Sequence, residues 1–187
     1  MTSSTIHPAT TSSTWTLDPA HTLVEFAAKH LMITTVKGRF SDVSGTIHID
    51  ETDPTASSVD AVIKAASIDT RTDQRDAHLK SADFLEVQRY PEITFTSTKV
   101  ERAGGAHYRV TGNLTIHGVT KPVVLDVHDE GRTKDPWGGE RAGFSATTRI
   151  DRRDFGLTWS QVVESGGLVV GNEIRITLEV EATRTSA

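Results

Sequence analysis

The chain has 187 residues, of which 36% are hydrophobic and 24% charged, and this length supports one hydrophobic core rather than two. Its formal net charge of -5 offers no basic surface to gather phosphates, which excludes nucleic acid and anionic membrane surfaces as expected partners. The absence of cysteine excludes disulfides, thiolate metal sites and a cysteine nucleophile.

The first fourteen residues, MTSSTIHPATTSST, are rich in serine and threonine and predict a disordered tail over 1–14. They contain neither a basic region nor an apolar run, so we expect no secretory signal. No segment approaches the ~20 apolar residues of a membrane span. We therefore expect a cytoplasmic protein without a transmembrane segment, with one folded domain at 15–183 and a frayed end at 184–187.

Alternation of apolar and polar residues dominates the chain and predicts half-buried strands. It is clearest in AHYRVTGNLTIH at 106–117, where the apolar side chains share one face. The pattern recurs and predicts about eight strands. Their apolar positions are Val24, Phe26 and Ala28; Val43, Ile47 and Ile49; Val59, Ala61, Ile63 and Ala65; Ile93 and Phe95; Tyr108, Val110, Leu114 and Ile116; Val123, Leu125 and Val127; Ala142, Phe144, Ala146 and Ile150; and Ile174, Ile176, Leu178 and Val180.

Short turn-forming segments at 104–105, 117–122 and 135–139 join some of these strands. They are too short for parallel crossovers, so consecutive strands are expected to pair antiparallel in a meander. Such a meander forms a sandwich, a barrel, or an open sheet covered by other elements. Because too little helix is predicted to cover a sheet, and closure removes exposed edges, we expect an all-β, extended, antiparallel eight-stranded barrel.

One short charged helix is predicted in this all-β chain, near residues 72–82. Thr72 or Asp73 can cap its start, and Asp76 and Lys80 form a favourable pair one turn apart. Its narrow apolar stripe can rest on a core without being buried. We expect this helix to lie as a lid across the mouth of the barrel.

The eight histidines do not show the spacing of a metal site. His21 and His30 are nine residues apart, which points their side chains to opposite faces of a single strand, and no His-x-His pair occurs. We expect solvated histidines and no metal.

Asp76, His78 and Asp83 form the best acid–base cluster, because a histidine beside carboxylates can titrate near neutrality. Helix capping and surface polarity explain the same residues, so we do not expect an enzyme. An enzyme that acts on a hydrophobic substrate with this cluster remains the alternative.

Seven segments, in this order, resemble the YceI family of lipocalin-like proteins. They are WTLDPAHTLVEFAAKH at 15–30, VKGRF at 36–40, SIDT at 67–70, RDAHLKSADFLEVQRYPEITFTS at 75–97, GNLTIHGVTKPVVLDV at 112–127, RIDRRDFGL at 149–157 and GNEIRITLEVEA at 171–182. The resemblance implies an extended lipocalin-like barrel that binds polyisoprenoids or other long amphiphilic lipids. Many relatives begin with a secretory signal that these first residues do not show, so the resemblance does not identify the physiological lipid.

Several positions in phase with the large apolar residues are small, such as Ala61, Gly112 and Ala146. Either a lengthwise apolar tunnel results, or large residues such as Phe95 face the small ones and fill the interior. The resemblance favours the tunnel. On their phase, we assign to its wall Val24, Phe26, Phe40, Ile47, Ile49, Ile63, Phe95, Leu114, Ile116, Leu125, Phe144 and Ile176, with Phe84 and Trp159 at one end.

We therefore expect the protein to bind, sequester or transport a polyisoprenoid or similar amphiphile, such as an isoprenoid quinone, without catalysis and without a further cofactor. Four residues near the helix are expected to meet a head group: Arg71, Arg75, His78 and Lys80. A solvated helix face and a structural module without a ligand are the alternatives. A homodimer would cover the ends of the barrel, although no pattern in the sequence counts subunits.

Overall fold

The computed structural model describes residues 12–162, 164, 167 and 169–185. Most of the predicted N-terminal tail, at 1–11, and the last two residues of the predicted frayed end therefore lie outside the described residues. The first strand begins at Ser12, three residues before the expected start of the domain at Trp15. The last strand continues to Arg184, one residue beyond the expected end of the domain at residue 183.

Eleven strands, one α-helix and three 3-10 helices occur in the described part of the chain. The strands are β1 (Ser12–Leu17), β2 (Leu23–His30), β3 (Thr34–Phe40), β4 (Val43–Asp50), β5 (Ser58–Lys64), β6 (Ile68–Asp69), β7 (Glu92–Gly104), β8 (His107–Ile116), β9 (Val119–Lys134), β10 (Glu140–Asp151) and β11 (Val170–Arg184). The helices are α1 (Asp73–Lys80) and the 3-10 turns η1 (Pro54–Ala56), η2 (Ala65–Ser67) and η3 (Arg152–Phe155).

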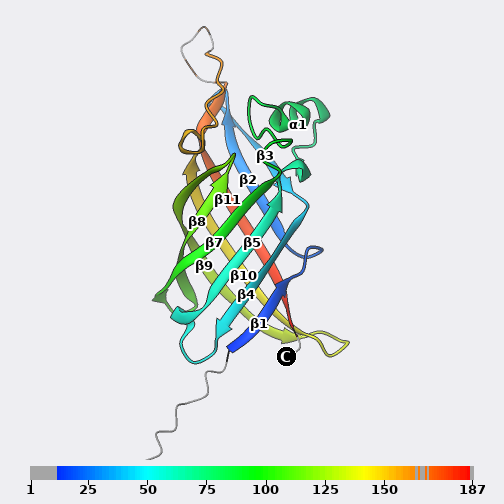
Figure 1. The fold of residues 1–187 in the computed structure, drawn as a ribbon, viewed down its shortest axis with the longest axis vertical. Helices are drawn as coiled ribbons and strands as arrows, with labels where there is room; N and C mark the ends of the chain where they lie inside the picture. Colours follow the sequence, from blue (N-terminus) through cyan, green and yellow to red (C-terminus); the bar gives the residue numbers. More distant parts are fainter. Residues whose placement is uncertain (1–11, 163, 165–166, 168, 186–187) are drawn as a thin grey trace, which may run out of the picture.

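All strand pairs are antiparallel, and together they close a barrel (Figure 1). From β7 to β11, each strand pairs with the next along the chain, and β11 returns to pair with both β1 and β2. Because β1 and β2 both pair with β11, one after the other along it, they share one position in the barrel. Their partners, β4 beside β1 and β3 beside β2, share the next position. The predicted eight-stranded antiparallel meander is confirmed.

The strands β1 and β3 were not predicted, and a bend separates β1 from β2. Leu17 pairs with Ala182 and Leu23 with Glu179, so β11 runs past the bend without interruption. In β1 the inward series contains Ser13 as well as Trp15, and in β3 it contains Gly38. These polar or absent side chains interrupt the apolar alternation from which strands are predicted.

The connection from β8 to β9 is a two-residue turn formed by His117 and Gly118. Their φ angles are 53° and 72°, the left-handed values that a tight hairpin turn requires at both central residues. A Cβ on Gly118 would lie 2.5 Å from the ring of Tyr90, so glycine also admits that ring. The turn is shorter than predicted, because β9 already begins at Val119.

The helix α1 forms inside the predicted range, but its predicted contacts differ. Thr72 is the N-cap residue, yet its side chain makes no capping bond. Asp76 does not pair with Lys80; its Oδ1 accepts hydrogen bonds from the backbone N (2.9 Å) and Oγ1 (2.5 Å) of Thr70. Since Thr70 is buried directly after β6, these bonds tie the helix to the end of that strand.

Candidate ligand-binding cavity

A cavity of about 680 Å³ extends through the barrel, within the roughly 300–1,000 Å³ range of small-molecule sites. Its lining contains residues from the strands around the barrel, Leu79 of α1, and Phe84 and Leu85 of the segment that follows α1. The interior is therefore lined by side chains and not filled by them, which decides between the two predicted outcomes in favour of a tunnel.

The residues predicted for the wall line the cavity, with one exception. They are Val24, Phe26, Phe40, Ile47, Ile49, Ile63, Phe84, Phe95, Leu114, Ile116, Leu125, Phe144 and Ile176. Trp159 is not among the lining residues; its ring packs on His78 and Phe84, with centroids 4.8 Å and 5.2 Å away. The period-two pattern is informative because every second side chain of a barrel strand points inward.

Glycines in the wall leave room for aromatic rings beside the backbone. A Cβ on Gly112 would lie 2.3 Å from the ring of Phe95, and a Cβ on Gly38 would lie 2.3 Å from the ring of Phe26. The rings therefore occupy space that any other residue at these two positions would take. This close approach lets the two rings lie close against the wall, so that they project less far into the lumen.

One end of the cavity is sealed by a buried cluster, and we call it the closed end. Ala65 and Phe155 there are each only 1% exposed, and Leu85 and Val87 pack in the same cluster. The helix α1 lies at this end (Figure 1). As expected for a helix that rests a narrow apolar stripe on the core, no residue of α1 is buried, while its Leu79 packs against this cluster and lines the cavity. The segment after α1, with Leu85 and Val87, helps to seal this end, and a lid role for α1 stays a prediction.

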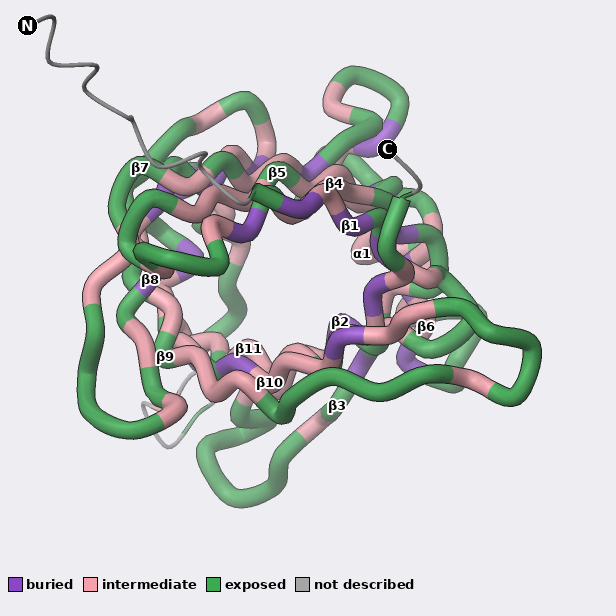
Figure 2. The backbone as a smooth tube through the Cα atoms, turned by 90° about the horizontal axis from the view of Figure 1, so that it is seen from below, coloured by how far each residue is buried: buried purple, intermediate pink, exposed green. Residues whose placement is uncertain are grey.

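The opposite end, which we call the open end, is the one that Figure 2 views, and mostly exposed connections surround it. Charged residues at this end line the cavity. Glu51 and Arg132 both line the cavity and are exposed. Arg132 Nη1 lies 3.2 Å from Asp129 Oδ1, and its guanidinium lies 5.5 Å from the ring centroid of Trp15. An amphiphile therefore has access to the apolar interior from this side.

None of the four predicted head-group residues lines the cavity: Arg71, Arg75, His78 and Lys80. Arg75 donates from Nε to Thr70 Oγ1 (2.7 Å) and from Nη2 to the Thr70 carbonyl (2.7 Å). It thus braces the segment in front of α1. Ligand contact by these four side chains stays a prediction that the lining does not support.

The predicted acid–base cluster is only partly assembled. His78 Nε2 and Asp83 Oδ2 are 2.8 Å apart, but Asp76 is bonded to Thr70 instead. None of these three residues lines the cavity. The arrangement suits a brace between α1 and its neighbours, and the geometry gives a bound ligand no contact with the cluster.

Sequence reasoning missed the ionisable residues of the lining, among them Asp129, Arg132 and Arg152. Asp129 could have been found, because it continues the inward phase of Val127. Arg132 follows a register shift near Gly143, which moves it out of the simple alternation and onto the inner face. Arg152 lies in η3, where no period-two pattern applies.

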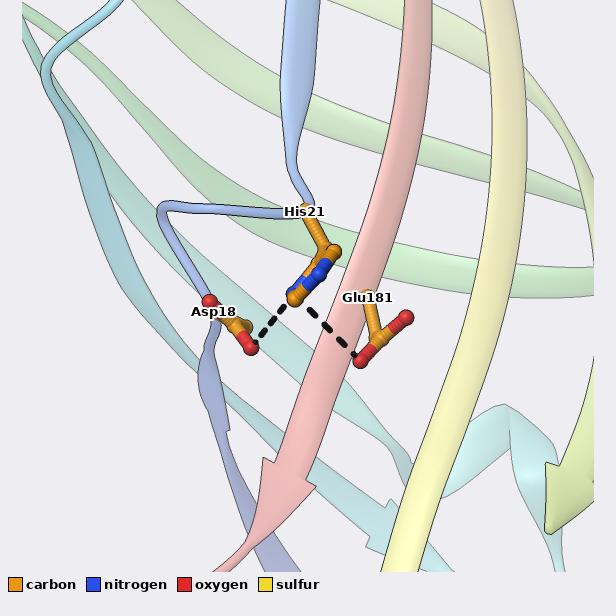
Figure 3. A group of neighbouring side chains, drawn as sticks. All are labelled: Asp18, His21 and Glu181. Carbon is orange, nitrogen blue, oxygen red and sulfur yellow. Dashed lines mark hydrogen bonds and ion pairs between the residues drawn. The ribbon is translucent and has the colours of Figure 1, made fainter. Parts of the chain in front are cut away.

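Asp18, His21 and Glu181 meet on the outside of the bend between β1 and β2 (Figure 3). Their ligand atoms lie within 4.8 Å of one another, close enough to hold a metal ion. However, Arg141 Nη1 already lies 2.7 Å from Asp18 Oδ2 and 3.0 Å from Glu181 Oε1. Because a guanidinium bonds to the same oxygens that a metal would need, we interpret the group as an ion-pair network.

The same contacts shift the titration of two of these residues. The hydrogen bond with Asp18, followed by the charges of Asp18 and Glu181, raises the pKa of His21. The bond with His21 lowers the pKa of Asp18, more than burial raises it. Both charged forms are thus favoured, and the network fixes the bend against β10 and β11.

Two kinds of comparison relate the chain to known sequences. The family model for the YceI-like domain matches residues 15–182. Protein YceI of Salmonella newport is 46% identical over 138 residues, which cover 74% of this chain and 72% of that protein. A UPF0312 protein of Shewanella baltica is 44% identical over 138 residues, with the same shares of the two chains.

Solved structures share the fold. BcnA of Burkholderia cenocepacia superposes with a TM-score of 0.79 at 25% identity, covering 89% of this chain and 99% of that chain. The YCEI protein of Campylobacter jejuni gives 0.72 at 38% identity, covering 84% and 90%. A polyisoprenoid binding domain from Saccharophagus degradans gives 0.66 at 17% identity, covering 91% and 98%, and this likeness concerns the fold alone.

Proposed function

The chain belongs to the family of YceI-like domains, and on this premise we propose that it binds a polyisoprenoid or a similar long-chain amphiphilic lipid inside its barrel. The observation that carries the proposal is the continuous cavity of about 680 Å³. The description of the Saccharophagus degradans domain as polyisoprenoid-binding supports the same ligand class.

The shape of the barrel suits a linear chain. The last strand, β11, has 15 residues and is therefore roughly 50 Å long at ~3.3 Å per residue. Apolar side chains follow its inner face through Ile174, Ile176, Leu178 and Val180, all of which line the cavity. A ligand gains about 0.8 kcal/mol for each buried methylene, so affinity is expected to rise with chain length until the tunnel is full.

We propose sequestration or transport, without catalysis, as the role of this binding, and an isoprenoid quinone as one ligand of suitable form. Supporting this, the lining is dominated by hydrocarbon side chains, while the His78–Asp83 pair lies outside it. A carrier needs only to bury its lipid and to release it, and the open end gives the lipid a path into and out of the lumen.

The test uses two neighbouring alanines of β2 that face opposite ways. Ala28 lines the cavity, whereas Ala27 does not and pairs with Lys37 of β3. Ala28→Phe is expected to narrow the tunnel and to lower the amount of lipid that mass spectrometry finds in an organic extract of the purified protein. Ala27→Phe is the matched control and is expected to leave that amount unchanged.

Two results would contradict the proposal. One is a wild-type protein that neither carries an extractable lipid nor binds added polyisoprenoid alcohols of increasing length. The other is equal loss of lipid in both alanine variants, because binding would then depend on the strand and not on its inner face.

A further inference from the structure

Arg152 is a buried cation at the closed end of the cavity. Its side chain lines the cavity although the residue is only 3% exposed. Nε donates to the carbonyl of Gly171 at 3.1 Å, and Nη1 donates to those of Leu157 (2.6 Å) and Trp159 (2.8 Å). A fourth, longer bond of 3.4 Å joins Nη2 to the carbonyl of Val170.

The charge of this guanidinium has no carboxylate partner among the described residues. The neighbouring Asp151 is engaged elsewhere, with its Oδ2 2.5 Å from Nη2 of Arg153. Burial accordingly lowers the pKa of Arg152. Carbonyl dipoles offset part of the cost of burying a charge, but a full counter-charge would stabilise the site further.

The hydrogen bonds of Arg152 use all but one of the N–H donors of its guanidinium. A guanidinium carries five N–H groups, and the bonds to the four carbonyls account for four of them. One N–H of Nη2 therefore has no acceptor within the described part of the chain. Because the side chain lines the cavity, an acceptor oxygen of a bound molecule can take this donor.

The open end has the opposite electrostatic character. Three of its lining residues are acidic, namely Asp50, Glu51 and Asp129, and Arg132 is the one basic residue beside them. A negatively charged head group is therefore repelled at the open end and attracted at the closed end. Both effects are strengthened because an apolar interior screens charge poorly.

We propose that the amphiphile binds head first, with an acceptor oxygen of its head group on the free N–H of Arg152 and its tail directed toward the open end. The head group that fits best is a carboxylate, since it supplies both the acceptor and the missing counter-charge. This inference rests on the proposed function, and it adds the orientation of the ligand and the chemistry of its head.

The orientation is tested on the wild-type protein with two spin-labelled stearic acids. One carries its nitroxide near the carboxyl end and the other near the methyl end. The first is expected to broaden the amide signals of Leu157 and Gly171, and the second those of Glu51 and Arg132. The reverse pattern would overturn the head-first inference and leave lipid binding intact, whereas no saturable binding of either probe would overturn both.

The head-group chemistry is tested with stearic acid, stearamide, stearyl alcohol and stearylamine, which share one tail. At about pH 8 the acid is ionised and the amine remains largely charged. The acid is expected to bind at least about tenfold more tightly than the amine, which corresponds to one charge-assisted hydrogen bond. The amide, which offers a neutral acceptor oxygen, is expected to lie between them. Equal affinities across the series would overturn the inference.

A matched pair of variants locates this preference. Arg152→Met removes the buried charge, and Arg153→Met removes the exposed neighbouring one. Only the first is expected to reduce the difference between acid and amine, to within about threefold. If Arg152→Met does not fold, the wild-type series and the spin-label pattern still decide the question. A preference that persists unchanged in a folded Arg152→Met variant contradicts the assignment.

Discussion

Phe95 lies against Gly112 across the β7–β8 pair, so close that a Cβ on the glycine would come within 2.3 Å of the ring. The Thr96 carbonyl would lie 2.7 Å from the same Cβ, which leaves little room for the backbone to yield. The absence of a side chain at Gly112 thus allows a large aromatic residue to pack beside the wall of the cavity.

Gly112→Ala is therefore expected to push the ring of Phe95 toward the lumen. Overpacking of this kind lowers the free energy of unfolding by about 1–3 kcal/mol, and the smaller lumen is expected to weaken binding of a long-chain lipid. Urea unfolding and lipid titration measure the two effects. Gly143→Ala is the control, because its Cβ would meet only Glu130 Cβ, at 3.3 Å. Similar behaviour of both variants would contradict this explanation.

Phe155 is 1% exposed and belongs to the cluster that seals the closed end. Phe155→Ala is expected to lower the free energy of unfolding by about 3–5 kcal/mol, as is usual when a buried phenylalanine is truncated. Trp137 is 87% exposed, so Trp137→Ala is expected to change the free energy of unfolding by less than about 0.5 kcal/mol. Denaturant unfolding of the two variants checks the contrast, and a mild effect at Phe155 would show that the closed end tolerates a gap.

His78 joins α1 to its surroundings through Asp83 and through ring contacts with Phe84 and Trp159, whose centroids lie 5.0 Å and 4.8 Å away. His78→Ala is expected to lower the free energy of unfolding by about 1 kcal/mol, the usual contribution of such contacts. Lipid retention, measured by mass spectrometry, is expected to persist because His78 does not line the cavity. The exposed His30 provides the control substitution, His30→Ala.

The same variant tests the enzymatic alternative. If the protein turned over a hydrophobic substrate with His78 as its acid or base, activity would collapse in His78→Ala while binding remained. A measured turnover that depends on His78 would therefore contradict the non-catalytic role.

The ion-pair network at the bend predicts a dependence of stability on pH. The pKa of His21 is raised above its ordinary value of 6.5, so its contribution is fully present below about pH 6.5 and is lost as the pH rises through the raised value. The pKa of Asp18 is lowered below 3.8, so its contribution is present above that value and is lost as the pH falls through the lowered one.

We expect the network to stabilise the bend most between these limits. Urea unfolding of the wild type should show a loss of stability as the pH rises above about 6.5 that is smaller in His21→Gln. An identical pH dependence in both proteins would show that His21 does not stay paired with Asp18 in solution.

The periodicity of the sequence predicted the wall of the cavity well, because a barrel strand must alternate between lumen and solvent. Val24, Phe26 and Ile176 face the lumen for this local reason. The strands β1 and β3 were not predicted, since Ser13 and Gly38 interrupt their inward series. Trp159 was assigned to an end of the wall, but it lies in a segment whose apolar residues do not alternate consistently, and its place beside His78 depends on a contact with α1.

By itself, then, the sequence determined an antiparallel β-barrel with an apolar interior, because turns and alternation are properties of neighbouring residues. Only the tertiary structure decided which end is sealed, and it placed Arg152 at that end and Asp129 and Arg132 at the other. The physical reason is that sealing an end and placing a charge depend on residues far apart in the chain. Phe155 and Leu85 meet in one cluster only after the barrel has closed, and no local pattern encodes that contact.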